Sequence, residues 1–227
     1  EYSMRLLIRK KVKIGAILLN GGTSYRHTVD QIKKFVNLRN KLVKEYNLSY
    51  SPHIHVDAVI GWMWLFFKGY DFKENPLRIK PRILRKIKRQ YKRISQLKYA
   101  DSWGVDFHKG IGGCPVDSSL FIFNHKRDMK YFSKRDNPAQ GLFGLHQITE
   151  RFNSVSPVNY TLENSRPSGP FLAALTNMHT LGTNGFRKYL VKLVENATHI
   201  HDFVEDHKDI EVKDPYKDGF VVMIRLY

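Results

Sequence analysis

The sequence contains little cysteine, no long apolar run and few acidic residues, and each shortage excludes a class of protein. Cys114 is the single cysteine among 227 residues, so no internal disulfide can form and a reducing, cytoplasmic location is expected. The most apolar run, WMWLFF (62–67), is far too short to span a bilayer. The stretch EYSMRLLIRKKVKIG lacks the apolar core of a signal peptide. We therefore expect no membrane anchor.

The shortage of acidic residues leaves a formal net charge of +17, from 38 basic against 21 acidic side chains. Much of the excess lies in residues 78–98, RIKPRILRKIKRQYKRISQLK. Its apolar residues recur at helical spacing, which predicts an amphipathic helix with Ile83 and Ile87 inward and Arg85, Lys88 and Lys92 in solvent. Because no nucleic-acid-binding motif accompanies this charge, nucleic acid is not expected as a partner. A binding module that uses the basic helix is the non-enzyme alternative.

Apolar runs alternate with helical patterns through the first half of the chain. Residues 12–20 (VKIGAILLN) predict a strand buried on both faces. A helix is expected within residues 28–47, capped by Thr28 or Asp30. Three further strands are predicted at 53–61 (HIHVDAVIG), 101–107 (DSWGVDF) and 118–124 (SSLFIFN). This order indicates an α/β fold with a largely parallel sheet, in which ligands bind at the carboxyl ends of the strands.

The second half of the sequence differs from the first in composition and pattern. Residues 133–169 are rich in Ser, Asn, Pro and Gly, which predicts a long, functional loop with a short helix. Residues 171–205 have a helical pattern broken around LGTNG (181–185). The segment GFVVMIRLY (219–227) is predicted to be a strand.

Chemically distinctive residues follow three of the predicted strands: the Gly21-Gly22-Thr23-Ser24 turn, Asp57, and His108 with Lys109. A partly desolvated lysine can form a Schiff base, and a buried aspartate can stabilise the protonated nitrogen of a pyridine ring. Singly, each has an ordinary structural explanation: a solvated lysine, a turn aspartate, a packed histidine. Together they favour a pyridoxal phosphate site.

A metal site is not expected from the two other histidines of the second predicted strand. His53 and His55 are two residues apart and so share a face of the strand. No third ligand is evident near them in the sequence.

Two of these segments, HIHVDA and ADSWGVDFHK, resemble paired signatures of the group II pyridoxal-phosphate-dependent amino acid decarboxylases, W-x-H-V-D-A-A and D-x-x-x-x-D-x-H-K. NGGTSYRHTVDQI is similar to the family's G-T-T turn and following helix. ENSRPSGPFLAALTNMHTLGTNGF is similar to its Arg-containing segment and interdomain helix. The resemblance implies a fold-type I enzyme: a three-layer, mostly parallel sheet and a small α+β domain, acting on an amino acid as a homodimer with shared sites.

The resemblance also implies roles for individual residues. Lys109 would hold the cofactor as an internal aldimine, and Asp57 would pair with the pyridinium nitrogen. His108 would lie by the cofactor phosphate or the substrate. The ring region near Asp57 would be supported by Thr23 or Ser24, and the cofactor face would be lined by Ala58 and Val59.

Two further regions would complete the site, but the sequence does not assign a role to any residue in them. Arg166 lies in the segment that approaches the active site in the family. The mobile loop that carries the family's proton donor would correspond to residues 131–147, where Tyr131 is the only tyrosine.

The sequence departs from the family pattern in several places. Val59 stands where alanine is common, Ile111 stands near a position often occupied by tryptophan or leucine, and the basic helix lengthens the interval between Asp57 and Lys109. The family's ring-stacking histidine and phosphate-binding loop have no counterpart. We therefore expect a fragment, with residues 1–170 as the carboxyl-terminal part of the cofactor domain and 171–227 as the interdomain helix and start of the small domain.

Alternative activities stay open because other fold-type I enzymes share the lysine–aspartate pair. Aldehyde synthases, lyases and aminotransferases are the enzyme alternatives. The divergent pattern gives no basis for choosing an aromatic amino acid or glutamate as the substrate.

Overall fold

The computed structural model describes residues 1–110, 114–125, 128, 167–213 and 219–227. Its main sheet comprises β1 (Ala16–Asn20), β2 (His53–Asp57), β3 (Ser102–Asp106) and β4 (Ser119–Phe123). The helices are α1 (Tyr2–Arg9), α2 (Ile32–Glu45), α3 (Pro81–Ile94) and α5 (Gly169–Glu205), with 3₁₀ helices η1 (Gly61–Phe67) and η2 (Ser95–Tyr99). The strands β5 (Ile210–Val212) and β6 (Ile224–Leu226) form a separate antiparallel pair.

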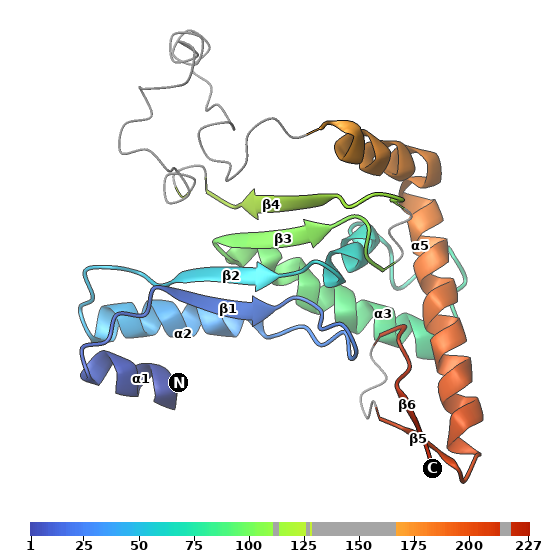
Figure 1. Cartoon of the computed structure of the whole chain (residues 1–227), viewed down its shortest axis with the longest axis horizontal. Helices are drawn as coiled ribbons and strands as arrows, with labels where there is room; N and C mark the ends of the chain where they lie inside the picture. The colour runs from blue at the N-terminus through green and yellow to red at the C-terminus, as the bar shows by residue number, and fades with distance from the viewer. Residues whose placement is uncertain (111–113, 126–127, 129–166, 214–218) are drawn as a thin grey trace, which may run out of the picture.

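The sheet has the strand order β1-β2-β3-β4, which is also the order along the chain. The first three strands are parallel, and β4 runs antiparallel to β3 at the edge (Figure 1). The predicted α/β class with a mostly parallel sheet is thus confirmed. The four strands predicted between residues 12 and 124 are all present in this sheet, although β1 is shorter than the apolar run that predicted it.

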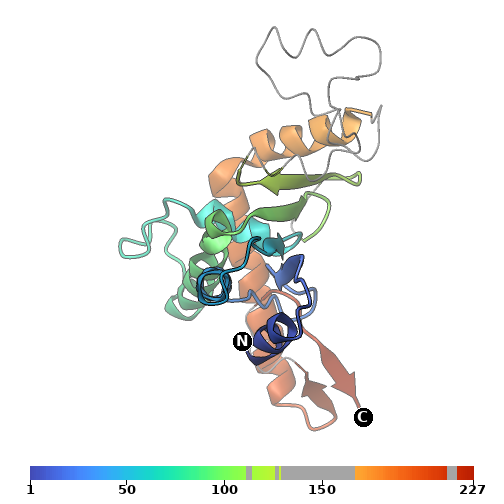
Figure 2. The same cartoon turned by 90° about the vertical axis from the view of Figure 1, so that its left-hand side faces the viewer.

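The helices α2 and α3 cover one face of the sheet, and the two views agree that the described part of the chain leaves the other face open (Figures 1 and 2). On β1, Leu19 points to the helices and is 4% exposed, whereas Leu18 is 76% exposed. The prediction that this strand is buried on both faces is therefore wrong for the described residues. A continuous apolar run is typical of a strand that is covered on both faces. In the described residues, helices cover only one face of β1.

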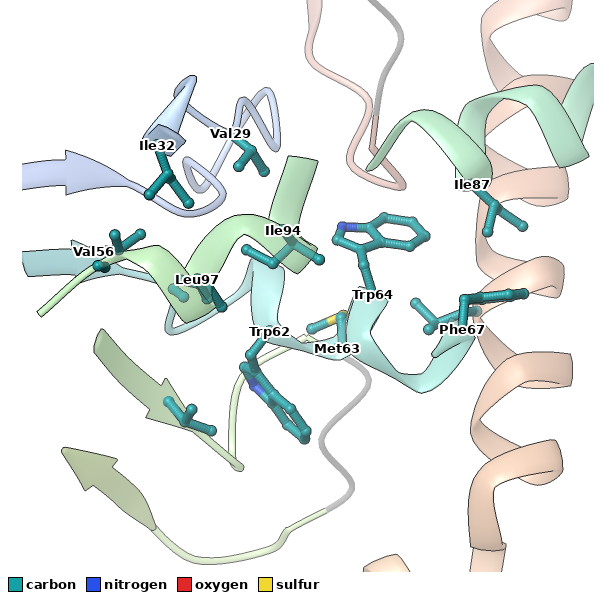
Figure 3. Close-up of a cluster of buried hydrophobic side chains, with 14 of the residues drawn as sticks. Val29, Ile32, Val56, Trp62, Met63, Trp64, Phe67, Ile87, Ile94 and Leu97 are labelled. Atoms are coloured by element: carbon teal, nitrogen blue, oxygen red, sulfur yellow. The ribbon is translucent and has the colours of Figure 1, made fainter. Parts of the chain in front are cut away.

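The core lies between the sheet and these helices and is centred on η1. Trp64, Met63 and Phe67 are fully buried there, next to Ile87 of α3 (Figure 3). The WMWLFF run is thus an internal 3₁₀ segment. None of the described helices is long and apolar enough to cross a membrane.

The basic helix has the predicted orientation. Ile83 and Ile87 of α3 are buried, and Arg85, Lys88 and Lys92 are exposed. Hence the apolar stripe joins the core, and these three basic side chains face solvent.

The start of α2 differs from the prediction. Its N-cap residue is Gln31, which makes no capping side-chain hydrogen bond. Asp30 instead accepts a hydrogen bond from the backbone N–H of Asn20 at 2.7 Å through Oδ2. The side chain that was predicted to cap the helix therefore ties the helix start to the end of β1.

The long helix α5 crosses beyond the carboxyl ends of β1, β2 and β3 (Figure 1). It is broken at Gly182, where φ is 59° and ψ is 176°, within the segment predicted to break. Arg187 anchors it to η1 by donating to the carbonyl oxygens of Phe66 and Lys68, each at 2.7 Å. The carboxyl edge of the sheet is thereby tied to α5.

A buried histidine below this edge makes the fold sensitive to acid. His27 is fully buried, its ring centroid lies 4.2 Å from that of Phe220, and neither ring nitrogen has a hydrogen-bond partner in the described structure. Burial disfavours the charged ring and lowers the pKa of His27 to about 4, from 6.5. The folded state is therefore a weaker base than the unfolded chain at this residue.

We expect the free energy of unfolding of the full-length protein to fall by about 3 kcal/mol through His27 as the pH drops from 7 to 4. The unfolded chain takes up the proton first, so the loss begins near pH 6.5 and is complete below the folded pKa of about 4. Chemical denaturation at a series of pH values measures it. His27→Asn, which tolerates the positive φ of 50° at this position, should flatten the decline, and the exposed His199→Asn should not. An unchanged slope in His27→Asn would refute the assignment.

Candidate active site at the strand ends

Asp57 ends β2 and lies on the open face of the sheet. Side chains alternate along a strand, so Val56 enters the core while His55 and Asp57 share the open face. Asp57 is exposed, and its Oδ1 accepts a hydrogen bond from the backbone N–H of Val59 at 3.3 Å. The strand register places it between Asn20 of β1 and Gly104 of β3.

Glycines hold the Asp57 turn against the turn that follows β1. The backbone N–H of Gly21 donates to the carbonyl oxygen of Asp57 at 2.7 Å. A Cβ on Gly21 would lie 2.7 Å from Cβ of Ala58, and one on Gly61 would lie 1.8 Å from the carbonyl oxygen of Gly21. Because no side chain fits between these backbones, the two strand ends are held at close contact.

Asp106 ends β3 beside Asp57 and binds Lys109. The residue is 8% exposed. Its Oδ2 lies 2.7 Å from Nζ of Lys109, and its Oδ1 accepts a hydrogen bond from Oγ of Ser119 at 2.6 Å. Burial by itself raises the pKa of Asp106, but the hydrogen bonds from Lys109 and Ser119 outweigh burial and leave that pKa below its usual value. Asp106 therefore stays ionised and holds the lysine at the strand end.

His108 lies near the same carboxylate oxygen that binds Lys109. Its Nδ1 accepts the backbone N–H of Ser118 at 3.0 Å and lies 3.2 Å from the carbonyl oxygen of the same residue. Acceptance of that N–H favours the tautomer of the neutral ring with its proton on Nε2. That atom lies 3.8 Å from Oδ2 of Asp106 and 3.8 Å from Oδ1 of Asp117. The histidine is thus oriented by backbone on one side and faces carboxylates on the other.

The two strand-end carboxylates line one hollow of about 620 Å³. Its walls include Leu18, His55, Val59 and Phe121 beside Asp57 and Asp106. Lys109 is not part of the wall. Its ammonium group is bonded to Asp106, which is a wall residue. The structure therefore links Lys109 to the hollow of Asp57 only through Asp106. Joint contact of Asp57 and Lys109 with a cofactor stays a prediction.

The remaining predicted residues lie elsewhere or outside the described residues. Oγ1 of Thr23 accepts the backbone N–H of Thr28 at 3.2 Å within its own turn, and neither Thr23 nor Ser24 lines the hollow. Ala58 is fully buried in the core, whereas Val59 is in the wall. Ile111, Tyr131, residues 131–147 and Arg166 lie outside the described residues.

Sequence reasoning missed three residues of this site. Asp106 is three residues before Lys109 in the same DFHK segment, and that short spacing could have indicated an ion pair. His55 was considered only as a metal ligand, although strand alternation places it on the same face as Asp57. Phe121 gave no signal, because its neighbourhood depends on β4 turning back antiparallel to β3.

Comparison with known proteins rests on structure alone. No protein-family profile matches the sequence, and no curated protein sequence matches it. Among solved structures, Oryza sativa TDC with PLP and tryptamine superposes with a TM-score of 0.70 at 14% identity, over 100% of this chain and 39% of that one. Rhodiola rosea 4-hydroxyphenylacetaldehyde synthase gives a TM-score of 0.65 at 14% identity, over 99% of this chain and 38% of that one.

The chain has the fold of the group II pyridoxal-phosphate decarboxylases. Mouse CSAD, matched with a TM-score of 0.66 at 10% identity, belongs to the same set. The fold implied by the sequence resemblance is thereby confirmed. This chain spans less than two fifths of the length of these three solved chains, since it covers 38% of one and 39% of each of the other two.

The hollow suits a cofactor of this fold in two respects. Its volume of about 620 Å³ is in the usual range for small-molecule sites, roughly 300–1,000 Å³. Its wall contains the Asp57 carboxylate, which could pair with a ring nitrogen. Outside the wall, Lys109 is bound to the wall residue Asp106 and has a side chain 45% exposed, which a carbonyl compound can reach. No lysine or arginine is among the wall residues of this hollow in the described part of the chain.

Proposed function

We propose that this chain is part of a pyridoxal-phosphate-dependent amino acid decarboxylase. One observation supports the proposal: in a decarboxylase fold, Asp57 and Asp106 line one hollow at the carboxyl ends of parallel strands, and Asp106 binds Lys109. Ligands of parallel α/β sheets bind at such edges. The residue identities and the fold thus support the same site.

Pyridoxal phosphate, when bound, acts as the electron sink for loss of carbon dioxide from the substrate. Lys109 would hold it covalently through Nζ. As an ammonium bonded to Asp106, that amine must first give up a proton, and its 45% exposed side chain gives water access for the transfer. Asp57 would accept a hydrogen bond from the ring nitrogen and keep that nitrogen protonated.

His108 would act next to Lys109. It would donate from Nε2 to the cofactor phosphate or to the substrate, beside the Asp106 oxygen that also binds Lys109. Of the other predicted cofactor contacts, Val59 would pack on the ring, and Thr23 or Ser24 would support the ring region only through the turn that they form.

Further features of the intact enzyme follow from the resemblance and belong to the same proposal. We expect residues 1–170 to belong to the cofactor domain and 171–227 to open the small domain. We also expect a homodimer in the cytoplasm, where the single Cys114 needs no disulfide partner.

The experiment that tests this function uses the full-length protein, supplied with pyridoxal phosphate and a panel of amino acids. We expect carbon dioxide release and the corresponding amine from at least one of them. Because an aldehyde synthase shares the fold, aldehyde and ammonia are measured in the same samples. Aldehyde in place of amine would reassign the enzyme as an aldehyde synthase, and transamination or the absence of any product would refute decarboxylation.

A further inference from the structure

A polar chain of three side chains underlies the hollow and has no role in the function proposed above. Ser102 begins β3 and is fully buried. Its Oγ lies 2.7 Å from Nε2 of His53 and 2.8 Å from Nδ1 of His55. The two histidines are on the same face of β2, and Ser102 is the register partner of His55, so one hydroxyl joins both rings.

A hydroxyl carries a single proton, which restricts how it can satisfy two rings. Both histidines could donate to Oγ only if the hydroxyl proton had a third acceptor, and the described structure gives it none. An unpaired buried donor costs about 1–3 kcal/mol. The hydroxyl therefore donates to one ring nitrogen and accepts from the other. Because the contacts are through Nε2 of His53 and Nδ1 of His55, the two neutral rings have the same tautomer, both protonated on Nε2 or both on Nδ1.

The surroundings of His55 decide the direction of these hydrogen bonds. Its Nε2 lies 4.0 Å from the point where a Cβ on Gly104 would be, over the floor of the hollow. Asp57 and Asp106 line the same hollow, and their negative charges favour an N–H over a lone pair at that atom. The ring is fixed by stacking on Phe121, with centroids 4.9 Å apart and planes 7° from parallel.

We propose that His53 donates to Ser102 and Ser102 to Nδ1 of His55, so that His55 is a positioning residue that presents an Nε2–H donor to the Asp57 hollow. The chain of hydrogen bonds stands on geometry alone. Its use, to keep positive polarity beside the Asp57 carboxylate that holds the ring nitrogen, rests on the proposed function.

The tautomer can be read without cofactor or activity. In full-length protein labelled with ¹⁵N in the histidine rings, long-range ¹H–¹⁵N spectra at neutral pH should show a protonated Nε2 and an unprotonated Nδ1 for His55, assigned by its loss in His55→Gln. Ser102→Ala should abolish this single form and give a mixture of tautomers, and Ser102→Thr should restore it. Ser95→Ala, a serine on η2 away from the sheet face, is the matched control.

Two results would overturn the assignment of the chain: a protonated Nδ1 on His55 in the wild type, or an unchanged His55 tautomer in Ser102→Ala. A second measurement tests its use. Ser102→Ala should bind pyridoxal phosphate about fivefold more weakly than the wild type, the value of one ordinary hydrogen bond, and Ser102→Thr should recover the affinity. If the tautomer changes as expected and the affinity does not, the positioning role is wrong; if the wild type binds no cofactor, the proposed function fails and the tautomer result still stands.

Discussion

Replacement of Lys109 by alanine is expected to abolish the visible absorption band of pyridoxal phosphate in the full-length protein and to lower the rate of carbon dioxide release roughly 10³-fold. The band requires a covalent bond to Nζ, and the same amine moves protons during turnover, a contribution of about 10²–10⁴-fold in other enzymes. Absorption spectra before and after borohydride, with carbon dioxide release on the best substrate, measure both effects. The wild-type band should disappear on borohydride treatment.

A second variant separates the chemistry of Lys109 from its charge. Lys109→Arg keeps a cation that can bind Asp106, but a guanidinium does not form the covalent bond. It should therefore fold with the stability of the wild type and still lack the band. Lys92→Ala, on the exposed face of α3, is the control and should leave both readouts intact. A normal band in Lys109→Arg would exclude Lys109 as the attachment residue.

Substitution of Asp57 by asparagine should weaken binding of pyridoxal phosphate by roughly 10- to 100-fold, and lower turnover further at saturating cofactor. The change removes the negative charge that would hold the ring nitrogen in its protonated form, and a charge-assisted hydrogen bond contributes about 1.5–3 kcal/mol. Cofactor titration followed by absorbance gives the dissociation constant. The Asp57→Asn variant should fold normally, because Asp57 is exposed and the only hydrogen bond of its side chain among the described contacts is the one accepted from the N–H of Val59.

The matched control for Asp57 is Asp209→Asn, an exposed carboxylate in the turn before β5. It changes the net charge by the same amount but lies away from the sheet, so cofactor affinity should not change. Equal losses in Asp57→Asn and Asp209→Asn would mean that overall charge governs affinity. In that case Asp57 would have no specific contact with the ring.

The sequence predicted the strand ends well because local pattern determines them. The apolar residues before Asp57 and Lys109 are bounded by polar and glycine-rich segments, and both segments end parallel strands in the structure. The stripe through Ile83 and Ile87 likewise gave the buried side of α3, since helical periodicity depends on near neighbours alone.

Features that depend on distant partners were not predictable from the sequence. The exposure of Leu18 depends on whether a second layer covers β1, which its apolar run cannot report. Asp30 met the pattern of a helix cap, but the backbone of Asn20 competed for its carboxylate. Ser102 is an ordinary strand residue in the sequence, and its contact with two histidines exists only once β2 and β3 are in register.

The parallel pairing of β1, β2 and β3 also has a kinetic consequence. Ala16 pairs with His53, and His55 with Ser102, so each pairing closes a long crossover before it gains any ladder hydrogen bond. Such non-local contacts slow folding, because loop closure costs entropy in advance. Asp57 and Asp106 therefore become neighbours only once β2 and β3 have paired across the connection that contains η1 and α3.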